Sequence, residues 1–115
     1  MTIQEQLLTL LSGATAAGTR VYPMTAPDAV AKPYVIYQRI SSNVESVMAG
    51  TSGLTNTRVQ IDVYARTYAE ATGIAAQIAS LMSAWAVQNV SIVLQDFYED
   101  PVKLFRVSQD YSLWH

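Results

Sequence analysis

Residues 57–66 read Thr-Arg-Val-Gln-Ile-Asp-Val-Tyr-Ala-Arg, and this stretch predicts the centre of the fold. Apolar side chains alternate along it with polar or amphipathic ones. The apolar set is Val59, Ile61, Val63 and Ala65, and the second set is Arg58, Gln60, Asp62, Tyr64 and Arg66. Strict alternation predicts a strand with one buried and one solvated face. The residues that follow, Thr67-Tyr68-Ala69-Glu70, predict the start of a helix.

Further strands are predicted on both sides of this one. Residues 34–40, 90–99 and 103–114 are rich in β-branched and aromatic residues, and residues 20–22 predict a short, weak strand. Residues 34–40 carry apolar side chains on both faces of the predicted strand, which is typical of a central strand or of one whose second face is covered.

Two helices are expected, over residues 3–11 and from residue 68 to about residue 86. The pairs Thr2/Glu5 and Thr67/Glu70 have the spacing of capping boxes, and Gly13 is a suitable helix stop. The order of elements is helix, weak strand, two strands, helix, two strands. This order predicts a single α+β domain over residues 1–115, with an antiparallel sheet of about four strands and both helices on one face.

Residues 41–54 form a long excursion between two predicted strands. They are rich in Ser, Thr, Asn and Gly, and the apolar residues Val44, Val47, Met48 and Leu54 are spread among them. Loops this long are uncommon unless they are functional or disordered. Two interpretations stay open: a partner-binding arm, and a floppy hairpin tip.

The composition indicates a covered surface. Half of the residues are hydrophobic and only 14% are charged, whereas about 25% is usual for soluble domains. A partner that covers part of the surface explains this, and a small, mildly hydrophobic monomer is the alternative. The net charge of −2 and the absence of a basic run argue against tight nucleic-acid binding.

The residues give little sign of reaction chemistry. The chain has no Cys, and its one His is His115. Glu99 and Asp100 are adjacent, so they point to opposite faces of a strand, and no Lys follows the Gly50-Thr51-Ser52-Gly53 segment at P-loop spacing. We therefore expect no enzyme activity, cofactor or metal site. We also expect no secretory signal, because residues 1–5 lack its basic start, and no membrane span, because no apolar run approaches about 20 residues.

Several segments together resemble the tail-completion proteins of long-tailed bacteriophages and prophages. They are Val21-Tyr22-Pro23, Ala26-Pro27, residues 33–41 (Pro-Tyr-Val-Ile-Tyr-Gln-Arg-Ile-Ser), residues 59–65, residues 67–71, and Asp110-Tyr111 with Trp114 close behind. The order and spacing of these segments carry the resemblance, which covers nearly the whole chain.

The resemblance implies a structural virion protein, a tail terminator or head–tail joining protein. Such a protein forms a homo-oligomeric ring, commonly a hexamer, that caps the head-proximal end of the tail tube and stops its growth. The implied partners are the major tail tube protein and neck or connector proteins, with DNA only passing through the lumen. The implied location is the virion tail, assembled in the bacterial host cytoplasm.

Two classes of function follow. The first is this tail terminator, for which we predict an oligomer or partner interface at Val44, Val47, Met48, Leu54, Arg58, Gln60, Asp62, Tyr64 and Arg66. A different virion joint, such as a neck or tube subunit, belongs to the same class. The second is a cofactor-free enzyme or ligand-binding protein on a ferredoxin-like α+β dimer, which requires a closed pocket lined by Tyr37, Tyr64 or Trp85.

Overall fold

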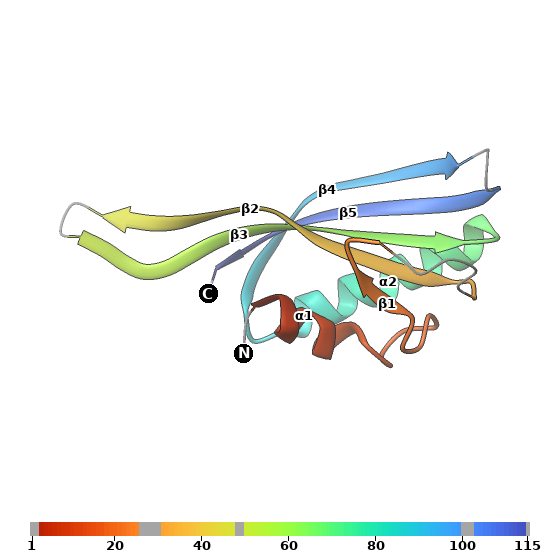
Figure 1. Ribbon diagram of the computed structural model, residues 1–115, viewed down its shortest axis with the longest axis horizontal. Helices are drawn as coiled ribbons and strands as arrows, with labels where there is room; N and C mark the ends of the chain where they lie inside the picture. Colours follow the sequence, from red (N-terminus) through yellow and green to blue (C-terminus); the bar gives the residue numbers. More distant parts are fainter. Residues whose placement is uncertain (1–2, 26–30, 48–49, 100–102, 115) are drawn as a thin grey trace.

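A computed structural model describes residues 3–25, 31–47, 50–99 and 103–114 (Figure 1). The elements are α1 (Ile3–Leu11), β1 (Val21–Pro23), β2 (Tyr34–Val47), β3 (Gly50–Ala65), α2 (Tyr68–Ala84), β4 (Gln88–Glu99) and β5 (Leu104–Trp114). Their order is the predicted one. The predicted capping residue Thr2 lies outside what the structure describes, as do Asp100, His115 and the side chain of Glu99.

The sheet is mixed and has five strands in the order β1-β2-β3-β5-β4. The pairs β2–β3, β3–β5 and β4–β5 are antiparallel, as expected. The expectation of about four antiparallel strands is wrong at β1, which pairs in parallel with β2 through Val21 and Val35. The connection between Pro23 and Tyr34 is long enough to return the chain to the end of the sheet where it started, so the two strands run the same way.

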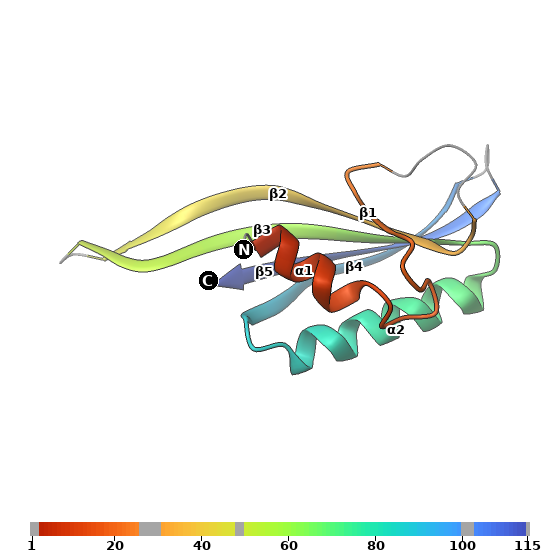
Figure 2. The ribbon, with the colours of Figure 1, turned by 60° about the horizontal axis from the view of Figure 1, so that its bottom comes forward.

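The core lies between the helices and one face of the sheet. The alternation in β3 has the predicted effect, because Val59, Ile61, Val63 and Ala65 are all buried. Both helices cover this face, as Figure 2 shows, and they contribute buried residues that include Leu7, Leu11, Ile74, Ile78 and Met82. The opposite face of the sheet carries the polar set of β3.

The ends of the helices follow from local chemistry. Thr67 precedes α2, and its Oγ1 accepts a hydrogen bond from the Glu70 backbone N–H at 3.1 Å, one half of the predicted capping box. Helix α2 ends at Ala84, about two residues before the predicted end, because Trp85 is already extended. Gly13 has φ +77°, a left-handed conformation that Gly adopts without strain after the last turn of α1.

Strands β2 and β3 continue through most of the predicted excursion as a two-stranded ribbon. Their pairing runs to Val47↔Gly50, with register shifts between Arg39 and Ser41 and between Val44 and Ser46. Among the described residues the last β3–β5 pair is Asn56↔Trp114, so β3 continues past the described end of β5. We call residues 44–47 and 50–55 the arm. It projects from one end of the body (Figure 1) and gives the molecule its elongated dimensions of 52 × 25 × 24 Å.

Candidate assembly interface

The polar set of β3 lies on the sheet face away from the helices, and its members bond to neighbouring strands. Gln60 Nε2 donates to Ser108 Oγ at 3.0 Å and to Asp62 Oδ1 at 3.2 Å, and it lies next to Gln38, which donates to Gln60 Oε1 at 3.3 Å. The side chains of Gln38, Gln60 and Ser108 therefore form a cross-strand row over β2, β3 and β5.

Two ion pairs on the same face also link β3 to β5. Arg58 Nη2 lies 3.0 Å from Asp110 Oδ2, and Arg106 Nη2 lies 3.4 Å from Asp62 Oδ2. The Arg106 guanidinium also lies over the rings of Tyr64, at 5.9 Å, and Phe97, at 5.1 Å. Arg58, Asp62 and Tyr64 thus have partners within the chain. The face is not simply solvated, because Asp62 is only 6% exposed.

The other predicted interface residues lie at the two ends of β3 and in β2. Val44 and Val47 lie in the β2 half of the arm and Leu54 in the β3 half, and their side chains are outside the description, as is Met48 altogether. Arg66 is exposed just after β3, where the chain turns into α2. The structure thus divides the predicted set between the arm and the polar sheet face.

Sequence reasoning missed the apolar edge of the sheet. Among the described residues, eight large hydrophobic side chains are exposed, and five of them belong to β4: Val90, Ile92, Leu94, Phe97 and Tyr98. Strand β4 is the outer strand, so its free edge also presents unpaired backbone groups. It contains no Lys or Arg. A bulge at Ile92, where the register shifts between Ser91 and Val93, is one feature that protects this edge. Such an edge is typical of a surface that a partner covers.

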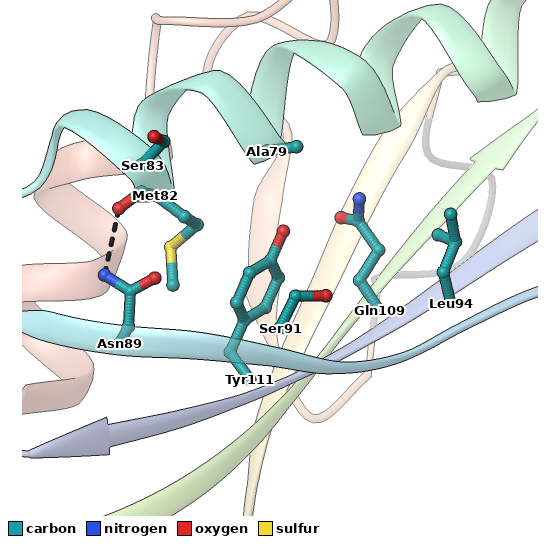
Figure 3. Close-up of a pocket in the computed structure, with 8 residues that line it drawn as sticks. All are labelled: Ala79, Met82, Ser83, Asn89, Ser91, Leu94, Gln109 and Tyr111. Atoms are coloured by element: carbon teal, nitrogen blue, oxygen red, sulfur yellow. Dashed lines mark hydrogen bonds between the residues drawn. The ribbon is translucent and has the colours of Figure 1, made fainter.

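A groove runs between α2 and β4 on the helix side of the sheet (Figure 3). Two adjoining hollows of about 280 Å³ and 210 Å³ share Ala79, Leu94 and Gln109 in their walls. Small residues line the α2 side, among them Ala75, Ala76, Ala79 and Ser83. Leu94, which is 63% exposed, lines the β4 side. The small side chains leave the space open, because they do not reach across to β4.

Hydrogen bonds tie α2 to β4 at both ends of this groove. At one end, Asn89 Nδ2 donates to Met82 O at 2.9 Å (Figure 3) and to Val87 O at 2.8 Å. At the other end, the Tyr68 hydroxyl donates to Asp96 Oδ2 at 2.5 Å, and this bond raises the pKa of Tyr68. The walls of the groove are therefore held in place at each end.

Gln109 and Tyr111 of β5 form the floor. Gln109 is only 4% exposed, and its Nε2 donates to Ala75 O at 2.9 Å. Its Oε1 is buried and has no hydrogen-bond partner among the described residues, and it points to the side of the groove where Tyr111 and Ser91 lie (Figure 3). An unsatisfied buried acceptor costs about 1–3 kcal/mol. Burial also raises the pKa of the Tyr111 hydroxyl.

Two of the residues named for an enclosed ligand pocket line separate hollows. Tyr37 lines a hollow with Met24 and Arg39, and Trp85 lines another with Thr9 and Leu10. Across the described ranges, no three His, Cys, Asp or Glu side chains gather as metal ligands. No helix in the described part of the chain is long and apolar enough to cross a membrane.

Comparison with protein families decides the class. The profile described as tail completion protein gp17 matches residues 1–115. The chain belongs to this tail completion family. The resemblance found in the sequence is thereby confirmed, and the tail completion protein is a structural component of a phage-type tail.

Solved structures support the fold of this tail completion protein. A chain in the virion of a native gene transfer agent (GTA) particle matches it with a TM-score of 0.62 and 18% identity, covering 94% of this chain and 82% of that one. Comparison with curated proteins by sequence gave no match.

Proposed function

We propose that this tail completion protein caps the head-proximal end of the tail tube as a homo-oligomeric ring, a hexamer, and acts as a tail terminator. The ring stops tube growth and joins the tail to the head. The family match over residues 1–115 supports this role. A capping ring requires neither catalysis nor a cofactor. The protein is made in the bacterial host cytoplasm and is assembled there into the virion tail.

The observation that carries the proposal is the presence of two unlike features on one subunit. One is the arm, and the other is the apolar β4 edge with the adjoining groove. Figures 1 and 2 show the arm projecting from one end of the molecule, away from β4. Unlike surfaces on one subunit suit head-to-tail contacts, and such contacts form a ring when the rotation closes. A two-fold dimer needs only one self-complementary patch.

The predicted interface residues fit this scheme in two groups. Val44, Val47 and Leu54 belong to the arm, which projects from the body, and Met48 lies outside the described residues. The second group would contact a neighbouring subunit or a stacked partner, and it consists of Arg58, Gln60, Asp62, Tyr64 and Arg66. Arg58 and Asp62 already form ion pairs within the chain, whereas Arg66 is exposed just after β3. Their role is shape and polar complementarity more than new ion pairs.

The remaining partners are the major tail tube protein on one side of the ring and neck or connector proteins on the other. DNA passes through the lumen without being held. The net charge of −2 supports this last point, because tight DNA binding needs clustered cations that release counterions. A ring structure with a strongly basic channel would contradict it.

Tail length tests the proposal. Particles produced without this protein should have overlong tails that lack heads, and supplying the wild-type chain should restore uniform length, as seen by electron microscopy. The purified protein should form rings of the diameter found at the tail end. Tails of normal length and attached heads in its absence would contradict the role. If tails were absent altogether, the protein would belong to another virion joint, such as the tube.

A double substitution tests the arm. Val47→Asp with Met48→Asp adds two charges to the predicted interface, so we expect loss of rings and of termination while the body keeps its circular dichroism spectrum and melting temperature. The matched control is Thr9→Asp with Gln77→Asp, two positions on the helices. Normal termination by the first variant would remove the arm from the interface.

The ferredoxin-like enzyme or ligand-binding dimer is the alternative. It needs an enclosed pocket around Tyr37, Tyr64 or Trp85, and the hollows at Tyr37 and Trp85 are separate surface features. It is therefore the weaker proposal.

A further inference from the structure

We propose that the groove between α2 and β4 receives the arm of a second copy of this chain. This inference rests on the proposed ring, which requires contact between copies, and adds which two surfaces meet. The arm of each subunit then occupies the groove of the next, so the contact is head-to-tail and every groove in a closed ring is filled.

The receiving surface has an apolar wall, a free strand edge and small residues that leave room. Leu94 lies on the β4 wall, and Ala75, Ala76 and Ala79 line the helix side. An extended segment placed here can pair with the backbone of β4 and bury its side chains against these residues. The groove is held at both ends by the bonds of Asn89 and Tyr68, so it is formed before the partner arrives.

The arm has the matching chemistry. Its residues 44–47 and 50–55 include one charge, Glu45, and three apolar residues, Val44, Val47 and Leu54. Neutral hydroxyl donors occupy much of the rest, at Ser46, Thr51, Ser52 and Thr55. A two-stranded ribbon is marginally stable in water without a third strand or a packed face. A low-charge ribbon that leaves the body is therefore suited to burial on another molecule.

The orphan acceptor on the groove floor points the same way. In the described part of the chain, Gln109 Oε1 is buried with no hydrogen-bond partner, and the amide is fixed by the bond from Nε2 to Ala75 O. A hydroxyl or backbone N–H from an occupant would offset the penalty of that acceptor. The arm offers both kinds of donor together with apolar side chains.

The lengths agree. The groove follows β4 from Asn89 to Asp96, which is about 23 Å at 3.3 Å per residue between the two Cα atoms. The arm extends from Val44 to Val47 and back from Gly50 to Thr55, about 10–17 Å of strand in each direction. The ribbon can therefore lie within the groove along most of its length.

Cysteine cross-linking tests the contact directly, because the chain has no Cys of its own. One copy carries Thr51→Cys in the arm, and a second copy with a size tag carries Leu94→Cys in the groove. Both are produced together in cells that make the particles, and purified tails are treated with a short bismaleimide. The matched control replaces Leu94→Cys with Thr9→Cys on exposed α1.

We expect the tagged heterodimer with Leu94→Cys to exceed that with Thr9→Cys by on the order of tenfold or more, because docked thiols meet at millimolar effective concentration. Ala79→Arg, which fills the groove, should abolish the cross-link, whereas Ser80→Arg on the next position of α2 should not. Circular dichroism of both Arg variants establishes that they fold.

The outcomes separate this inference from the proposed function. Tails that contain the protein and end normally, but give equal cross-linking at Leu94 and Thr9, would overturn the arm–groove contact and leave the ring intact. Cross-linking between two Leu94→Cys copies would replace it with an edge-to-edge dimer of β4. If the protein were missing from the tails, the proposed function itself would fail.

Discussion

Arg106 and Asp62 face each other across β3 and β5, with Nη2 3.4 Å from Oδ2, and the Asp62 side chain is only 9% exposed. The second ion pair of this face, Arg58 with Asp110, is shorter at 3.0 Å, but its Arg side chain is 40% exposed. The shorter bond is therefore the more solvated one. Burial, more than distance, should decide what each pair contributes to stability.

Removal of the two carboxylates should reveal this difference. Asp62→Ala leaves Arg106 without its anion on a largely covered surface, so we expect it to lower the free energy of unfolding by about 2–4 kcal/mol. Asp110→Ala, its matched control, should lower it by about 1 kcal/mol or less. Urea denaturation of both variants measures the difference. Equal losses would mean that the burial of Asp62 has no energetic consequence.

The start of α2 offers a test of local capping. Thr67→Ala removes the oxygen that accepts from the Glu70 N–H, and we expect a loss of about 1 kcal/mol. Thr67→Gly should lose only a few tenths of that amount, because Gly is tolerated at this position. Thermal or urea denaturation would show the order wild type, Gly, Ala. A change below the error of the measurement for Ala would rule out a contribution from the cap.

Two isoleucines separate folding from assembly. Ile61 is fully buried in β3 and Ile92 is 44% exposed on β4. Ile61→Ala should lower the free energy of unfolding by about 2–5 kcal/mol, because it leaves a cavity in the core. Ile92→Ala should change stability by less than about 0.5 kcal/mol, yet reduce ring formation. Denaturation and size-exclusion chromatography of the same two samples distinguish them. A large stability loss at Ile92 would assign it to the core and not to an interface.

Alkaline pH should destabilise the fold through its buried tyrosines. Burial raises the pKa of Tyr111 above the ordinary value of 10.0, so the folded state keeps a proton that the unfolded chain releases. The stabilisation is complete below pH 10 and is lost as the pH rises from there through the folded pKa, by at most about 1.4 kcal/mol per pH unit for one such group. Tyr111→Phe should make this decline shallower when unfolding is followed from pH 9 upward. Parallel curves for variant and wild type would exclude Tyr111 as a contributor.

Much of the fold could be predicted because the sequence patterns within individual strands and helices were clear. In β3 the alternation of Val59 and Ile61 with Gln60 identified the buried face, and the Thr67 to Glu70 spacing placed the start of α2. The parallel pairing of β1 could not be predicted, because three residues carry no information on direction and the return path depends on the long connection to β2. The ribbon in residues 41–54 was missed since Asn43, Gly50 and Gly53 belong to residue types that are depleted in strands, and pairing between the two neighbouring segments outweighs that preference.

The candidate interface was harder to predict for a related reason. Strand β4 has the consecutive apolar residues Ile92, Val93 and Leu94, a pattern typical of a strand covered on both faces. Sequence alone does not say whether the cover comes from the same chain or another one. Here β4 is an outer strand, so the pattern indicates a partner. The role of Gln109 could not be predicted either. It lies between Ser108 and Asp110 in the sequence, and only the packing of α2 over β5 shows that its Oε1 is buried and unsatisfied.

The hydrogen bonds of Asn89 and Tyr68 that close the two ends of the groove bear on the speed of recruitment. A receptor whose walls are already fixed loses little internal motion when it is filled, so each arriving subunit meets the same rigid socket. Encounter and orientation then limit the rate. Successive subunits should join the ring on the tube end at similar speeds, and addition of the last subunit should need no slow rearrangement of those already in place.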